Sequence, residues 1–192
     1  MKNNKNYVVI VLLVAVVSLG IYLLIRKNQN TQKTVYFAET KLSIAPELGK
    51  GKIDGQIGVQ LIAETGNGAK ISSIDTQICY GNELSVDEAD PSSQVELNTE
   101  ALGLLVDVSI VGEDNKCLRL VAIANLDKKP EDLVTGTVPL ATIKFLAKLT
   151  GSGEIIIDGS KTKVGGYNPK PGATDNAIKV EEIKNAGYVI SI

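Results

Sequence analysis

In Ala141-Thr-Ile-Lys-Phe-Leu-Ala-Lys-Leu149 every second residue is apolar over nine positions, and three of the four residues between them are polar. Successive side chains of a β-strand point to opposite sides of a sheet, so one face of this stretch collects its apolar residues: Ala141, Ile143, Phe145, Ala147 and Leu149. The period of two predicts a strand that packs one face on a core and exposes the other, which carries Thr142, Lys144 and Lys148, to solvent.

The same period recurs through most of the chain after residue 34. Apolar residues alternate at 57–61, 74–80, 118–122, 155–157 and 188–192. Glycine supplies the positive φ of tight turns, and turn signals lie between these runs at 49–51, 66–68, 81–82, 151–153 and 165–166. The pattern predicts an all-β fold of about nine strands, arranged as a two-sheet sandwich with a jelly-roll or Greek-key path.

The N-terminal segment has a different pattern. Residues 7–25 form an apolar run without charge, and at about 1.5 Å per residue this run spans a hydrocarbon core of roughly 30 Å. It predicts a single transmembrane helix that anchors an extracellular C-terminal domain to the cell membrane. The expected division is a cytoplasmic tail at 1–6, the helix at 7–25, a stalk at 26–37 and the β domain at 38–192.

A cleaved signal peptide is the alternative for this segment. The basic start at Lys2 and Lys5 and the small residues Ser18 and Gly20 fit a signal sequence with a cleavage site. Against it, the apolar run continues to residue 25 before Arg26-Lys27 end it. Lysine and arginine flank both ends of the run, so charge alone does not decide its orientation.

Composition limits the function of the β domain. Residues 34–192 hold all 22 acidic residues and 15 of the 20 basic ones, a net charge of −7. Nucleic-acid binding needs the opposite balance, because basic side chains must neutralise phosphates. The chain has no His and only two Cys, which do not make a zinc or copper site. We therefore expect neither a metal nor another cofactor.

Several stretches resemble cohesin domains. Ile71-Ser-Ser-Ile-Asp-Thr-Gln-Ile-Cys-Tyr80, followed by Gly81-Asn82 and Glu83-Leu-Ser-Val86, is similar to the third strand and following turn of that family. Residues 136–147 and 153–157 resemble its seventh and eighth strands, and 187–190 resemble its closing strand. Cohesins usually have Asp-Pro after the third-strand tyrosine, where this chain has Gly81-Asn82. The resemblance covers nearly all of residues 38–192.

Cohesins are non-catalytic receptors that bind dockerin modules. The resemblance implies a module that binds a dockerin-like or other partner protein through the sheet of strands eight, three, six and five, and the predicted anchor would hold this module at the cell surface. The implied contact residues are Ser73, Asp75 and Gln77 on the third strand and Arg119 and Val121 on the sixth. Cohesins often carry Asn and Asp on the third strand, and only Asp75 matches. The alternative interpretation of Asp75 is a solvated carboxylate on an outer sheet face.

Cys79 and Cys117 are both out of phase with the core residues beside them. If the third and sixth strands pair antiparallel, as in the resembling family, the end of one strand meets the start of the other. A cross-strand disulfide on the outer face is then possible, and such bonds persist in exported proteins. Two free thiols are the alternative.

Carbohydrate binding is the alternative function. Sugar-binding platforms use rows of exposed aromatic rings. Here Tyr80, Phe145 and Tyr188 are in phase with the core, and Tyr36 and Phe37 adjoin the stalk. Tyr167 alone lies in a predicted loop. One ring is a poor platform for a polysaccharide, although a short glycan bound by polar loops stays open.

Catalysis has little support in the sequence. Asp87, Glu88 and Asp90 cluster in a predicted loop, and paired carboxylates can hydrolyse glycosides. No pattern places two of them across a cleft, so we expect a solvated acidic loop, with a loose calcium site as the alternative.

Overall fold

The computed structural model describes residues 35–66, 68–112, 116–168, 170 and 176–192. Tyr36–Ile192 form one compact unit built almost entirely of β-strands. The predicted transmembrane helix at 7–25 lies outside the described residues. Within the described ranges, no helix is long and apolar enough to cross a membrane.

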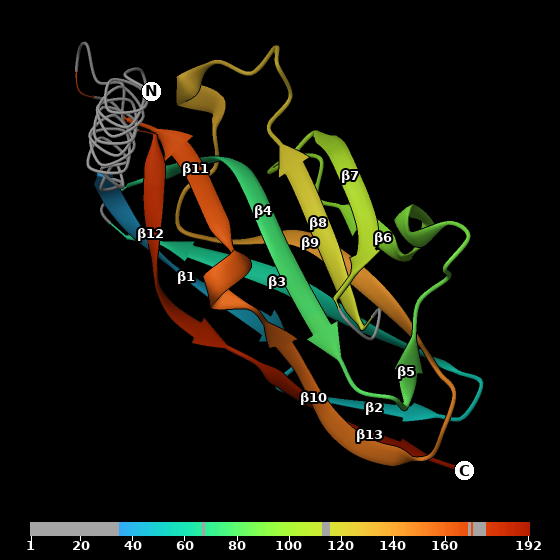
Figure 1. Ribbon diagram of the computed structural model, residues 1–192. Helices are drawn as coiled ribbons and strands as arrows, with labels where there is room; N and C mark the ends of the chain where they lie inside the picture. Colours follow the sequence, from blue (N-terminus) through green and yellow to red (C-terminus); the bar gives the residue numbers. More distant parts are fainter. Residues whose placement is uncertain (1–34, 67, 113–115, 169, 171–175) are drawn as a thin grey trace, which may run out of the picture. The chain divides into compact units, whose positions relative to one another are not determined.

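The described residues form thirteen strands and three short 3-10 helices (Figure 1). In chain order these are β1 (Tyr36–Ala45), β2 (Leu48–Lys52), β3 (Gln56–Thr65), β4 (Lys70–Tyr80), β5 (Leu84–Ser85), η1 (Pro91–Gln94), β6 (Val95–Leu97), β7 (Leu104–Val111), β8 (Cys117–Ile123), η2 (Pro130–Asp132), β9 (Thr137–Ala147), β10 (Gly151–Ile157), η3 (Gly159–Lys161), β11 (Lys163–Tyr167), β12 (Ala177–Lys184) and β13 (Ala186–Ser191).

Backbone hydrogen bonds join these strands into one sheet that folds over into two layers (Figure 1). In the front layer, β7 pairs with β8 and β8 with β4, which then pairs with β10 along one part and β11 along another. In the back layer, β12, β1, β3 and β9 lie side by side, and β5 and β6 pair with β9. Since β12 also pairs with β11, it connects the two layers.

Apolar side chains of the two layers meet in one core. Phe145 of β9 is fully buried, and its ring centroid lies 5.1 Å from that of Tyr80 on β4. Ile143 and Ala147 are also buried, which confirms the face predicted from the alternation. These contacts confirm the all-β class and fit a sandwich.

Leu149 does not belong to that face. The strand ends at Ala147, and Leu149 is 55% exposed. The chain turns here because the backbone N–H groups of Lys148 and Leu149 both donate to the carbonyl of Glu83. The alternating sequence therefore continues two residues beyond the strand.

The predicted count of about nine strands is too low, because three long strands are interrupted. Pro46, which has no N–H to donate, separates β1 from β2. The helix η3 separates β10 from β11, and its N-terminus is capped by Asp158, which accepts a 2.9 Å hydrogen bond from the Ser160 N–H. Asn185 separates β12 from β13 and accepts a 3.0 Å hydrogen bond from the N–H of Ile157 through its side chain. The short β5 and β6 add to the count.

The N-terminal boundary of the domain also differs from the prediction. β1 begins at Tyr36, and Phe37 packs against the core. Residues 36 and 37 are therefore part of the domain and not of the predicted stalk at 26–37.

Three of the five predicted glycine turns lie within strands. Gly49 and Gly51 belong to β2, residues 151–153 to β10 and residues 165–166 to β11. Their role is to leave space for a neighbour: a Cβ atom on Gly153 would lie 2.5 Å from Tyr188 Oη, and one on Gly51 would lie 2.8 Å from Ile57 Cγ1. Glycine here permits close approach between strands.

Candidate functional site

The outer side of the front layer presents a face built from alternate residues of β4, β8 and β7. We define this β4–β8–β7 face by Ser73, Asp75, Gln77 and Cys79 of β4, Cys117, Arg119, Val121 and Ile123 of β8, and Leu104, Val106, Asp107, Ser109 and Val111 of β7. The strand register arranges them in rows, since Gln77 lies opposite Arg119, Asp75 opposite Val121 and Ser73 opposite Ile123. The five residues predicted to bind a partner therefore lie together on one face.

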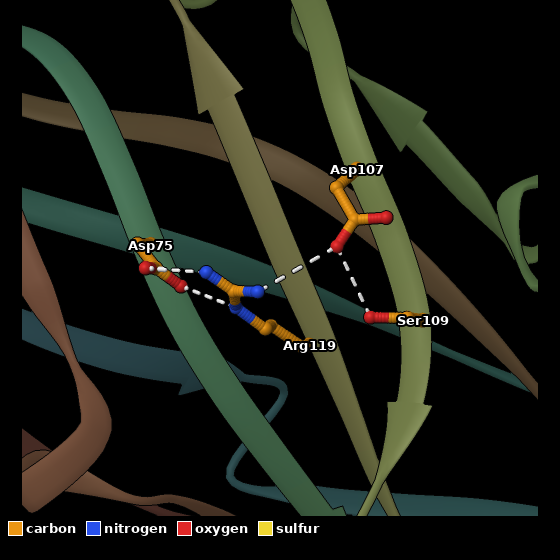
Figure 2. A network of polar contacts seen from close by, with 4 residues as sticks. All are labelled: Asp75, Asp107, Ser109 and Arg119. Atoms are coloured by element: carbon orange, nitrogen blue, oxygen red, sulfur yellow. Dashed lines mark hydrogen bonds and ion pairs between the residues drawn. The ribbon is translucent and has the colours of Figure 1, made fainter.

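Arg119 is the centre of a polar network on this face (Figure 2). Its Nε and Nη2 donate to Asp75 Oδ1 and Oδ2, each at 2.9 Å. Its Nη1 lies 3.8 Å from Asp107 Oδ2, which also accepts a 3.1 Å hydrogen bond from Ser109 Oγ. The planar guanidinium matches a carboxylate with two parallel bonds, so this one side chain links β4, β8 and β7.

The network determines the charge state of Asp75. The hydrogen bonds from Arg119 lower the pKa of the Asp75 carboxyl, and Lys163, which lies opposite on β11, lowers it further. The Asp75 and Arg119 side chains are 29% and 39% exposed, so both are accessible but already paired. Asp75 is therefore not a free solvated carboxylate. An incoming group would meet the ion pair as a unit.

An apolar row crosses one end of the face. Cys79 and Cys117 are register partners, half-buried, and joined by a disulfide. Ile156 of β10 lies opposite Cys79, and Val111 of β7 lies opposite Cys117. The row therefore spans four strands.

The other end of the face is also apolar. Leu104 and Val106 of β7 are 46% and 55% exposed, and Ile123 lies opposite Leu104. Val106 is the extra residue of a bulge between Leu105 and Asp107. This strand was not among the predicted ones, although the polar residues Asp107 and Ser109 alternate there with apolar ones.

The outer face of the back layer has a different chemistry. Ion pairs join Lys41 to Glu182 at 3.1 Å, Lys144 to Glu96 at 3.4 Å and Lys179 to Glu39 at 3.6 Å. Such exposed pairs contribute little stability and keep a surface hydrated. The front face instead combines accessible apolar side chains with a fixed ion pair.

The other predicted features fall outside this face. In the acidic loop, Asp87 Oδ1 accepts a 2.9 Å hydrogen bond from the Ala89 N–H, and Asp90 accepts one from Ser92 Oγ. Among the described residues, no three His, Cys, Asp or Glu side chains are grouped closely enough to hold a metal ion.

The aromatic residues follow the predicted phase. Tyr80, Phe145 and Tyr188 are buried, as predicted, whereas Tyr36 and Tyr167 are exposed. Tyr167 ends β11 and does not lie in the predicted loop. Carbohydrate binding stays a prediction that these positions do not test.

Comparison with known proteins relates this fold to cohesins. No family model matches the chain, and no curated protein matches its sequence. Among solved structures, a non-cellulosomal cohesin from the archaeon Archaeoglobus fulgidus superposes with a TM-score of 0.54 at 21% identity, covering 81% of this chain and 93% of that one. The solution structure of CaCohA2 from Clostridium acetobutylicum gives 0.57 at 13% identity, with coverages of 80% and 92%.

A cohesin that was solved with its partner matches equally well. The sixth cohesin of scaffoldin B from Acetivibrio cellulolyticus, in complex with a mutant dockerin, has a TM-score of 0.57 at 15% identity, covering 79% of this chain and 99% of that one. The β domain therefore has the cohesin fold, which confirms at the level of the fold the resemblance drawn from the sequence.

Proposed function

We propose that the β domain is a non-catalytic module that binds a dockerin-like partner protein through the β4–β8–β7 face. The observation that carries the proposal is the contrast between the two outer faces of the domain. Within the described residues, the outer side of the front layer has accessible apolar side chains at both ends, such as Leu104 and the neighbouring Ile156 of β10, around a central ion pair. The outer side of the back layer instead carries several exposed ion pairs. The match to a cohesin solved with a dockerin supports the choice of partner class.

The chemistry of the face suits such a partner. Burial of the apolar ends would supply the hydrophobic part of the binding free energy. The Asp75–Arg119 pair is already formed, so binding would not have to order these two side chains. Arginine is enriched among the residues that dominate interface energies, and Arg119 lies at the centre of the face.

The test is a binding titration of the full-length chain against a panel of purified dockerin modules. Asp75→Ala and Arg119→Ala should each weaken binding by about tenfold or more. Lys144→Ala is the matched control, because it removes an exposed ion pair from the back face and should leave the affinity unchanged. Wild-type affinity in both front-face variants, or no binding by any dockerin, would contradict the proposal.

We also propose that residues 7–25 anchor this module in the cell membrane with the β domain outside. The support is their charge-free apolar sequence, which Arg26-Lys27 end. The full-length chain should fractionate with membranes, resist carbonate extraction and lose residues 36–192 to protease added to intact cells. Recovery of a soluble, N-terminally trimmed protein from the medium would show instead that the run is a cleaved signal peptide.

A further inference from the structure

The Cys79–Cys117 disulfide lies within the face proposed to bind a partner. The two cysteines form the last register pair of the β4–β8 ladder, and the next pair is Gln77 with Arg119. The disulfide is therefore two residues along the strand from the guanidinium at the centre of the polar network. Both cysteines are half-buried on the outer side of the layer, so a small reductant can reach them.

In the described part of the chain, β7 and β8 are hydrogen-bonded to the rest of the front layer through one ladder, that of β4 with β8. Among the described strands, β7 forms a ladder with β8 alone. None of the β7 side chains is fully buried, whereas Leu118 and Leu120 of β8 are. The peripheral part of a sheet opens more readily than its core. The side of the face that carries Asp107 and Ser109 is thus the part most able to move.

The polar network crosses the β4–β8 ladder. Asp75 comes from β4, Arg119 from β8 and Asp107 from β7 (Figure 2). Just beyond the disulfide, noncovalent contacts continue the pairing: the Tyr80 N–H donates to the Lys116 carbonyl at 3.0 Å, and Lys116 Nζ contacts Asn82 Oδ1. Cys79–Cys117 is a covalent link between β4 and β8, and it prevents these two strands from separating at this end.

From these positions we propose that the Cys79–Cys117 bond makes partner docking sensitive to the redox state, an inference that rests on the proposed function. In the oxidised chain the strand ends are held together and the face is preorganised. A dithiol reductant supplies two electrons and two protons. The protein disulfide becomes two thiols and the reductant becomes a disulfide. The end of the ladder then frays, Arg119 loses its fixed position, and binding has to order the face again.

The first arm of the test needs no partner. Amide hydrogen exchange is measured on the full-length chain as prepared, after dithiothreitol treatment, and in Cys79→Ser/Cys117→Ser. Labelling is kept short enough that amides of β3 and β9 stay protected in the untreated chain. In the reduced chain and in the variant, amides of β7 and β8 should exchange about tenfold faster while β3 and β9 stay protected. Dithiothreitol should not change the variant further.

Two results of this arm would overturn the proposal. Unchanged exchange in β7 and β8 would show that the disulfide does not hold these strands. Equal acceleration in β3 and β9 would show that its loss destabilises the whole domain without a local effect on the face.

The second arm measures affinity for the tightest-binding dockerin of the panel described above. Reduction should weaken binding to the oxidised chain by about tenfold, and the double serine variant should bind like the reduced chain with or without dithiothreitol. Equal affinity in both redox states would overturn the proposal. If no dockerin binds, the proposed function fails and redox-sensitive docking fails with it, whereas the exchange arm still reports whether the disulfide controls the β7–β8 pair.

Discussion

Tyr188 Oη donates a 2.7 Å hydrogen bond to Glu83 Oε2, which joins β13 to the turn after β4. The Tyr188 ring is buried, and its hydroxyl lies so close to Gly81 and Gly153 that a Cβ atom on either would overlap it. This contact explains why position 81 is glycine. A side chain at position 81 would collide with the tyrosine hydroxyl.

Removal of that hydroxyl should change both stability and its dependence on pH. Tyr188→Phe should cost about 1–3 kcal/mol of unfolding free energy at neutral pH, since the lost hydrogen bond goes to a charged group. The hydrogen bond from Tyr188 lowers the pKa of Glu83. Burial is the main cause that raises the pKa of Tyr188 above its ordinary value, and the hydrogen bond to Glu83 adds to it. Urea unfolding from pH 3 to 11 measures both effects.

The two pKa shifts affect the stability of the domain in opposite pH ranges. Because the Glu83 pKa is depressed in the folded state, its contribution is present above about 4.3, the ordinary value, and is lost as pH falls below it. Because the Tyr188 pKa is raised, its contribution is present below about 10 and is lost as pH rises above it. Tyr188→Phe should flatten both limbs. Parallel curves for the variant and the wild type would contradict this assignment.

Two glycines in strands should respond oppositely to alanine. Gly153→Ala places a Cβ atom 2.5 Å from Tyr188 Oη and 2.8 Å from its Cζ, so we expect a loss of about 1–3 kcal/mol. A Cβ atom on Gly58 of β3 meets nothing within 4 Å, and Gly58→Ala should be neutral or slightly stabilising. Chemical unfolding of both variants measures the difference. Equal effects would mean that Gly153 is not needed for space.

The centre of the core should be sensitive to truncation. Phe145→Ala removes a fully buried ring that packs against Tyr80, and it should cost about 3–5 kcal/mol of unfolding free energy. The control is Lys144→Ala, one residue earlier on the solvated side of β9, which should change stability by less than about 0.5 kcal/mol. A loss below about 1 kcal/mol for Phe145→Ala would contradict the burial of this ring.

The ionisation of Asp75 should depend on Arg119. In the wild type, NMR titration should place the Asp75 pKa below its ordinary value of about 3.9, because Arg119 donates two hydrogen bonds to the carboxylate. Its contribution to stability is therefore present above that ordinary value and is lost as pH falls through the folded pKa. Arg119→Gln should raise the Asp75 pKa. An unchanged titration would show that the pair does not form in solution.

The sequence predicts the structure of some strands better than that of others. The alternation around Ile143 and Phe145 identified a core face, because the inward side chains from residue 141 to 147 are apolar and two of the three outward ones are polar. The same rule could not find the end of the strand. Leu149 continues the pattern, yet the Glu83 carbonyl, far away in sequence, accepts the hydrogen bonds that turn the chain.

Only part of the candidate site could be predicted from the sequence. Asp75 and Arg119 could be placed on neighbouring strands, but not their bidentate pairing, which depends on the diagonal reach of a long side chain across the register. The contribution of β7 was not predicted, although Asp107 and Ser109 alternate there with apolar residues. Glycines such as Gly153 were interpreted as turns, because the partner that requires their small size, Tyr188, is distant in sequence.

The parallel pairing of β1 with β12 sets the order in which the domain can be completed. Tyr36 lies opposite Ala177, so β1 cannot complete its pairing until β12 has been synthesised. As the chain emerges from the ribosome, β1 can pair with β3 early, and both cysteines are available well before β12 is made. Pairings between distant segments form slowly, and an open strand edge invites other chains. The domain therefore stays exposed to misassembly until residues 177–184 are made and cover β1.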